Sequence, residues 1–153
     1  MPRPRFTLAA VLLAAPPLAA LLVAPLARPL VAQSPEDGRN CARAVDDAAR
    51  NPDARGRLQA LAAAAGPVAT FAQGCLALVD GQYARAGDLF DRAATANPAS
   101  AVAQFWLGRA YGEQAQRANV FKQAALARRT KAAFERAVQL DASYVDPREG
   151  LLQ

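Results

Sequence analysis

The sequence predicts an all-α protein built from antiparallel helix pairs, and an internal repeat is the main reason. Phe71 recurs 34 residues later as Phe105. The same distance separates Gly74 from Gly108, and it is the length of a helix–turn–helix repeat unit. Between the two copies, residues spaced by three, four and three positions follow the 3.6-residue period of a helix, and they are Tyr83, Ala86, Phe90 and Ala93.

Residues 67–100 are expected to form one complete helix pair. Gly74 lies midway along its first helix, where the missing side chain lets the second helix approach closely. Phe90 fills the space between two alanines on one face of the second helix. Gly81 relaxes the tight turn between the helices, and Pro98 ends the second helix because proline cannot continue it.

Residues 101–142 are expected to form a second, enlarged pair. Direct repetition would place the equivalents of Phe90 and Ala93 at two alanines, Ala124 and Ala127. Phe134 is a better match to Phe90 and lies ten residues further along the chain. Because ten residues are about three helical turns, the pair can lengthen without rotating its apolar face. That face comprises Leu126, Thr130, Ala133, Phe134 and Ala137.

The order of these residues resembles the tetratricopeptide (TPR) repeat. From Gly74 onward it reads G-x6-G-x-Y-x2-A-x3-F-x2-A-x4-P, and the second copy reads WLGRAYG…AFERAVQLD. The second copy is similar to exported bacterial TPR proteins with an enlarged repeat, and the resemblance extends over residues 67–153. It implies a TPR-like right-handed superhelical stack of antiparallel helix pairs. It also implies a non-catalytic scaffold whose partner is another protein or peptide.

The resemblance further implies where such a partner binds. In TPR arrays the first helices of the repeats form a concave wall, and its positions in this chain are Val68, Phe71, Cys75, Leu78, Val79, Val102, Phe105, Arg109, Gly112 and Glu113. The wall is apolar with one charged edge, which favours a helix or an extended apolar segment as ligand. The alternative is that Phe71 and Phe105 only pack one repeat on the next.

Residues 1–32 have the features of a secretory signal peptide. Arg3 and Arg5 precede an apolar run over residues 6–27, and a small residue, Ala32, comes before the polar part of the chain. We expect cleavage after Ala32 and a periplasmic or extracellular mature protein. The alternative is a retained membrane anchor, because the run is long enough to span a bilayer. Three prolines interrupt it and favour the leader, namely Pro16, Pro17 and Pro25.

Residues 33–66 are expected to form a degenerate helix pair that caps the stack. Its helices would span 37–50 and 52–65, with Asn51 as N-cap and Pro52 at the first helical position. Cys41 and Cys75 are 34 residues apart and could occupy matching places on neighbouring first helices. In an exported chain two cysteines favour a disulfide, and two buried free thiols are the alternative.

The charge of the chain gives little support to nucleic-acid binding. The whole chain carries +5, from 18 basic and 13 acidic residues. Three arginines belong to the leader, so the mature part is nearly balanced. One local excess remains and comprises Arg117, Lys122, Arg128, Arg129, Lys131 and Arg136, opposed only by Glu135. It indicates a solvated helix face or, alternatively, a patch for anionic lipid or an acidic partner.

Catalytic and metal-binding motifs are missing from the sequence. The chain has no histidine, which removes the usual general base, the Ser-His-Asp triad and imidazole metal ligands. It has no C-x-x-C motif either. Acidic pairs such as Asp88 and Asp91 are typical of solvated helix faces. The sequence therefore favours a protein that is not an enzyme and that needs no cofactor or metal.

Residues 143–153 read as the opening of a further first helix that lacks its second helix. The chain is therefore expected to be a fragment of a longer protein. Two alternatives to an exported scaffold remain open. One is a membrane-associated protein with a retained anchor and a basic helix at lipid headgroups, and the other is the non-catalytic N-terminal part of an enzyme.

Overall fold

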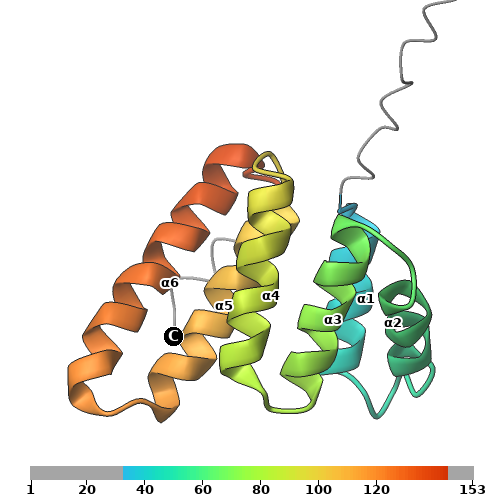
Figure 1. Cartoon of the computed structure of the whole chain (residues 1–153), viewed down its shortest axis with the longest axis horizontal. Helices are drawn as coiled ribbons and strands as arrows, with labels where there is room; N and C mark the ends of the chain where they lie inside the picture. Colours follow the sequence, from blue (N-terminus) through green and yellow to red (C-terminus); the bar gives the residue numbers. More distant parts are fainter. Residues whose placement is uncertain (1–32, 145–153) are drawn as a thin grey trace, which may run out of the picture.

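The computed structural model describes residues 33–144, and within them it has six helices and no strand. The all-α prediction is therefore confirmed for this part of the chain (Figure 1). The signal peptide expected at 1–32 and most of the further helix expected at 143–153 lie outside the described residues. The helices are α1 (Pro35–Val45), α2 (Ala54–Ala62), α3 (Pro67–Val79), α4 (Tyr83–Ala96), α5 (Ala101–Arg117) and α6 (Val120–Leu140).

Helices that follow one another in the chain pack side by side. From α2 to α6 each helix contacts the next, and short turns reverse the chain between them (Figure 1). Gly81, in the turn between α3 and α4, has a φ of 70°, a conformation that favours glycine. Helix α4 ends at Ala96, two residues before Pro98. Both local predictions, for Gly81 and for Pro98, are confirmed.

The same glycine–phenylalanine contact holds the helices together in α3–α4 and in α5–α6. A Cβ atom added to Gly74 would lie 2.7 Å from Cε1 of Phe90. A Cβ atom added to Gly108 would lie 2.8 Å from Cε1 of Phe134. Phe134 is thus the counterpart of Phe90, as the sequence indicates, whereas Ala124 is exposed. The enlargement of the second pair by about three turns keeps this contact in place.

The centre of the core is a row of aromatic rings. Phe71, Phe90 and Trp106 are fully buried and come from α3, α4 and α5. The ring centroids of Phe71 and Phe90 are 5.3 Å apart, and those of Phe90 and Trp106 are 6.3 Å apart. Phe105 extends the row to Phe134 on α6 at 5.6 Å. Since burying each large apolar side chain stabilises the fold by about 1.5–3 kcal/mol, this row joins four helices into one core.

The start of α2 differs from the sequence-based expectation. Asp53 is the N-cap residue and the helix begins at Ala54, so Asn51 is not the cap and Pro52 lies outside the helix. The reason is that the side-chain amide of Asn51 donates to the carbonyl and carboxylate oxygens of Asp47. Asn51 therefore stabilises the turn that follows α1. The observed helix is also shorter than the expected 52–65.

Candidate functional site

Helix α1 begins two residues earlier than expected, because strong local signals fix its first turn. Ser34 accepts a hydrogen bond from the backbone N–H of Asp37, and the Asp37 carboxylate accepts one from the backbone N–H of Ser34. This reciprocal capping box satisfies donors that a helix start leaves unpaired. Glu36 accepts hydrogen bonds from Arg43 and Arg39, which lower the pKa of its carboxyl group.

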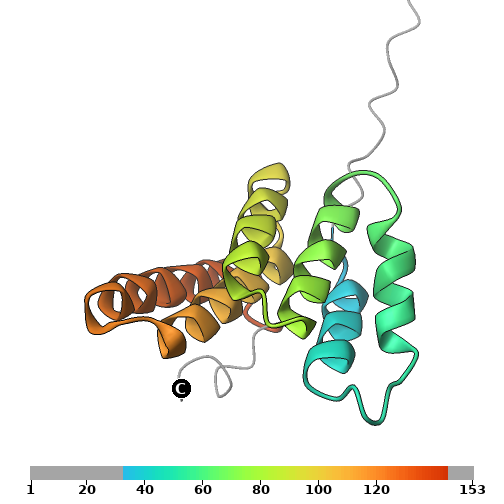
Figure 2. The ribbon, with the colours of Figure 1, turned by 60° about the horizontal axis from the view of Figure 1, so that its bottom comes forward.

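Helix α1 lies beside α3 (Figure 2) and also contacts α5, and these are the two helices on which the sequence places the partner-binding wall. A disulfide between Cys41 and Cys75 joins α1 to α3, with the two Cα atoms 5.5 Å apart. The sequence-based pairing of these cysteines is therefore present in the structure. Gly38 allows α1 to approach α5, because a Cβ atom there would lie 3.2 Å from Cγ1 of Val102.

The C-terminal end of α1 is tied to α5 by a two-point ion pair. Arg109 Nη1 donates to Oδ2 of Asp46 at 2.6 Å, and Nη2 donates to Oδ1 at 2.7 Å. The guanidinium of Arg109 also lies 4.8 Å over the centroid of the Trp106 ring. Bidentate pairs of this kind fix orientation as well as adding energy. Arg109 is thus engaged within the molecule.

Tyr144 covers the wall at Phe105, beside α1. Its ring meets the ring of Phe105 edge-on at 5.8 Å, and its hydroxyl group occupies the space in front of Gly38. Burial among these groups raises the pKa of the Tyr144 phenol. Residues from both ends of the described chain therefore meet on this side of α5.

These contacts correct the expectation of an open apolar groove. Phe71, Cys75 and Val102 are buried, so no partner reaches them in this arrangement. The physical reason is that Phe71 packs on Phe90, Cys75 is bonded to Cys41 of α1, and Val102 lies close to Gly38 of α1. The remaining wall positions outside the core are partly buried, and they are Val68, Val79, Phe105, Arg109, Gly112 and Glu113.

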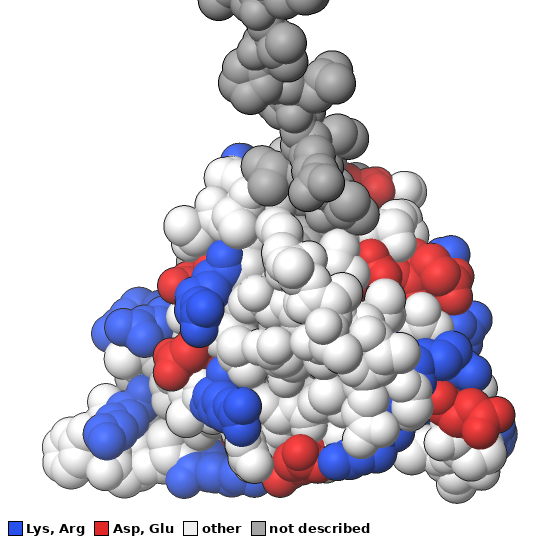
Figure 3. All heavy atoms as spheres, turned by 45° about the vertical axis from the view of Figure 1, so that its right-hand side comes forward, with Lys and Arg blue, Asp and Glu red and all other residues white. Residues whose placement is uncertain are grey.

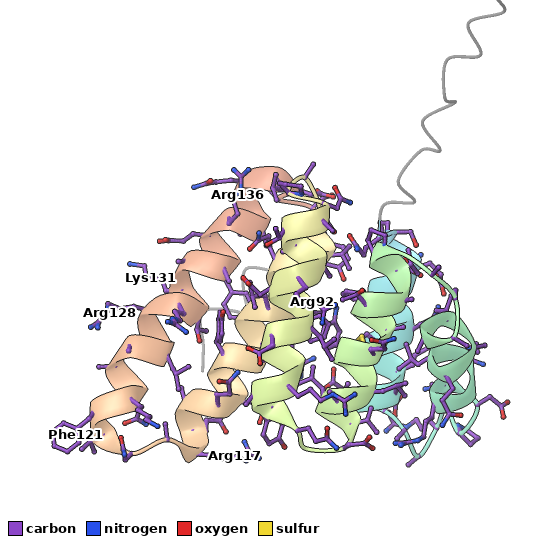
Figure 4. The ribbon with its side chains drawn as sticks, in the orientation of Figure 1. Arg92, Arg117, Phe121, Arg128, Lys131 and Arg136 are labelled. Carbon is purple, nitrogen blue, oxygen red and sulfur yellow. A yellow bond between two sulfur atoms is a disulfide. The ribbon has the colours of Figure 1, made fainter. Side chains whose placement is uncertain are left out.

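Helix α6 carries the basic residues on an exposed surface (Figure 4). Lys131 pairs with Glu135 at 3.7 Å, and Arg117, at the end of α5, pairs with Glu113 at 2.7 Å. Arg129 lies 5.8 Å from the ring centroid of Tyr111. The end of the molecule formed by α1–α3 differs from α6, because acidic and basic side chains intermingle there around an uncharged centre (Figure 3).

The first turn of α6 exposes two apolar side chains that the sequence reasoning did not single out. Phe121 is 89% exposed and Val120 is 73% exposed. Beside them is an open concavity of about 540 Å³, lined by Gly81, Gln82, Tyr83, Ala84, Arg85, Gln114, Arg117, Ala118, Lys122 and Leu126. The sequence feature that could have indicated this site is the apolar pair itself, which follows the capping residue Asn119 and precedes Lys122.

Neither a metal centre nor a membrane-spanning element emerges from residues 33–144. No group of three metal-ligating side chains occurs there. None of the helices described is both long and apolar enough to cross a bilayer. In comparisons with known proteins, no family model, no curated protein and no solved structure matches this chain.

Proposed function

We propose that this chain is a non-catalytic protein–protein interaction scaffold of the TPR-like type, belonging to an exported bacterial protein. The observation that carries the proposal is the repeated contact of Phe90 on Gly74 and of Phe134 on Gly108. Two helix pairs with the same internal packing form a stack of repeats, and such stacks present extended surfaces to other proteins. In this proposal the pairs follow the right-handed superhelical arrangement of TPR arrays.

Export is supported by two independent features of the chain. Residues 1–32 have the basic, apolar and small-residue order of a signal peptide. The disulfide between Cys41 and Cys75 fits an oxidising compartment, because disulfides persist outside the cytosol. We therefore propose a mature protein that begins at Gln33 and resides in the periplasm or outside the cell.

The part of the wall beyond the end of α1 is the proposed contact surface for the partner. Helix α1 ends at Val45, and the next residue, Asp46, forms an ion pair with Arg109 of α5. Glu113 lies one helical turn further along α5 and remains partly exposed. A partner segment can therefore meet the stack at Glu113 without displacing α1.

Photo-crosslinking in the exporting cell tests this placement. A photoreactive residue replaces Glu113 in one full-length variant and Gln59, an exposed residue of α2, in the control. We expect a crosslinked protein band from position 113 and none from position 59. Equal crosslinking from the two positions, or none from either, would contradict a partner surface at this edge.

The N-terminus of the purified protein tests export separately. Mass spectrometry should give Gln33 as the first residue, and the protein should fractionate without detergent. A full-length protein found in the membrane pellet, with residues 1–32 retained, would overturn this part of the proposal.

A further inference from the structure

The most exposed large apolar side chains of the described residues lie together at one corner of the molecule. Phe121 and Val120 form the first turn of α6, and Figure 4 shows Phe121 projecting at the lower end of that helix. Val138, the other exposed large apolar residue of the described part, is 41% exposed and lies near the opposite end of α6. An aromatic ring with only 11% of its surface covered contributes almost nothing to the core, so this position is not explained by folding.

Positively charged side chains surround this apolar corner. Arg85, Arg117 and Lys122 line the adjoining concavity, and no carboxylate is among its lining residues. Arg128 is exposed less than two turns further along α6 (Figure 4). Lys122 and Arg128 make no ion pair among the contacts of residues 33–144.

Acidic side chains neutralise only part of the positive charge at this corner. Glu113 is paired with Arg117, and Glu135 lies towards the other end of α6, beside Lys131. Asp88 and Asp91 on α4 act on Tyr111, where they add to the effect of burial in raising the pKa of that phenol. The first turns of α6 are therefore left with an excess of positive charge.

We propose that this corner docks the protein on an anionic lipid membrane. The side chains of Val120 and Phe121 enter the interface between headgroups and acyl chains. The cations of Arg85, Lys122 and Arg128 lie at the level of the lipid phosphates. Peripheral proteins bind membranes through this combination of inserted apolar side chains and basic residues at anionic headgroups.

The shape and charge of the corner favour a membrane over other anionic partners. Phe121 projects from the surface and is not among the residues that line the adjoining concavity. A fluid interface accepts such a projecting ring, because it closes around whatever enters it. Phe121, Lys122 and Arg128 are not among the wall positions, so substitutions at these three residues test membrane docking independently of the protein partner proposed above.

Vesicle binding by residues 33–153 is the test, since this form contains all the helices of the described residues and the disulfide but lacks the apolar leader. We expect co-sedimentation with phosphatidylglycerol-containing vesicles and at least about tenfold weaker binding to pure phosphatidylcholine. The affinity should fall as salt rises, because exposed charges are screened beyond about 8–10 Å at ordinary ionic strength.

Two variants and a matched control separate the apolar and the charged contributions. Phe121→Ser should weaken binding at least about tenfold, since the ring no longer enters the interface. The double variant Lys122→Glu, Arg128→Glu should weaken it by a similar factor and remove the salt dependence. Arg92→Glu changes an exposed cation of α4 away from the corner and should leave binding nearly unchanged (Figure 4).

A fluorescence readout reports insertion directly. The chain has one tryptophan, Trp106, which is buried and whose emission is already that of an apolar site. Phe121→Trp adds an exposed indole, and its emission should shift to the blue on phosphatidylglycerol vesicles and stay unchanged on phosphatidylcholine. Equal binding of Phe121→Ser and the wild type, or no blue shift on anionic vesicles, would overturn the proposal. Displacement from the vesicles by a single-stranded oligonucleotide would overturn it in favour of a nucleic-acid site.

Discussion

Replacing Gly74 with alanine should destabilise the wild-type protein and stabilise a Phe90→Ala variant. In the wild type the new Cβ atom would lie 2.7 Å from one carbon of the Phe90 ring and 2.9 Å from a second. The ring cannot move aside, because Phe71 and Trp106 pack against it. Overpacking costs about 1–3 kcal/mol, whereas alanine in place of glycine gains about 1 kcal/mol within a helix. The expected net change is a loss of up to about 2 kcal/mol.

The Phe90→Ala background reverses the sign of that change. Truncating this fully buried ring should itself cost about 3–5 kcal/mol, because it leaves a cavity. With the ring gone, alanine at position 74 meets empty space, and only its helix-forming advantage of about 1 kcal/mol remains. The coupling energy of the two substitutions should therefore be about 1–3 kcal/mol, the range found for residues in contact.

A double variant with one substitution in each of the two helix pairs supplies the control. Phe134 covers Gly108 rather than Gly74, so the effects of Gly74→Ala and Phe134→Ala should add to within about 0.5 kcal/mol. Urea unfolding, followed by circular dichroism with the disulfide intact, measures all of these variants. If Phe90→Ala does not fold, Phe90→Leu serves in its place with a smaller coupling. Equal destabilisation by Gly74→Ala in both backgrounds would refute the packing of Phe90 on Gly74.

Three further predictions concern the contacts of α1 and the position of Tyr144. The double substitution Cys41→Ser, Cys75→Ser should lower the free energy of unfolding in urea by about 3–4 kcal/mol, and alkylation of the unreduced wild type should find no free thiol. Burial raises the pKa of the Tyr144 phenol in the folded protein. The neutral phenol therefore contributes its full stability below the pKa of the unfolded state, about 10, and this stability is lost as pH rises through the pKa of the folded state. Between about pH 9 and 11 the melting temperature of the wild type should therefore fall more than that of Tyr144→Phe. Asp46→Ala should cost about 0.5–1 kcal/mol, and less at high salt, because its pair with Arg109 is partly exposed.

The features that the sequence predicts correctly depend on short-range geometry. Gly81 permits a positive φ and Pro98 ends a helix, and both effects are local to the backbone. They can therefore be predicted without knowing the fold. The glycine at position 74 predicts a close helix contact, because one face of a helix is fixed by its 3.6-residue period. The displaced counterpart Phe134 follows from the same period, since three added turns return to the same face.

The place of α1 could not be predicted in this way. The sequence indicates a helix near Cys41, a bridge to Cys75 and a helix pair that caps the stack, but it does not show that α1 also contacts α5. What brings α1 against α5 is the fit of Gly38 to Val102 together with the ion pair of Asp46. Contacts between residues more than 60 positions apart leave no periodic trace in the chain, so the contact of α1 with α5 appears only in three dimensions.

The lengthening of the second helix pair explains why the exposed corner lies on α6. Helices α5 and α6 have 17 and 21 residues, against 13 and 14 in α3 and α4. The fully buried positions of α6 are Ala133 and Ala137, both in its C-terminal half. The core contact of Phe134 therefore lies in that half, and none of the residues of the first three turns, 120–130, is buried. Substitutions in these turns should therefore change the free energy of folding little. This explains why the fold tolerates an exposed Phe121 beside Lys122 and Arg128.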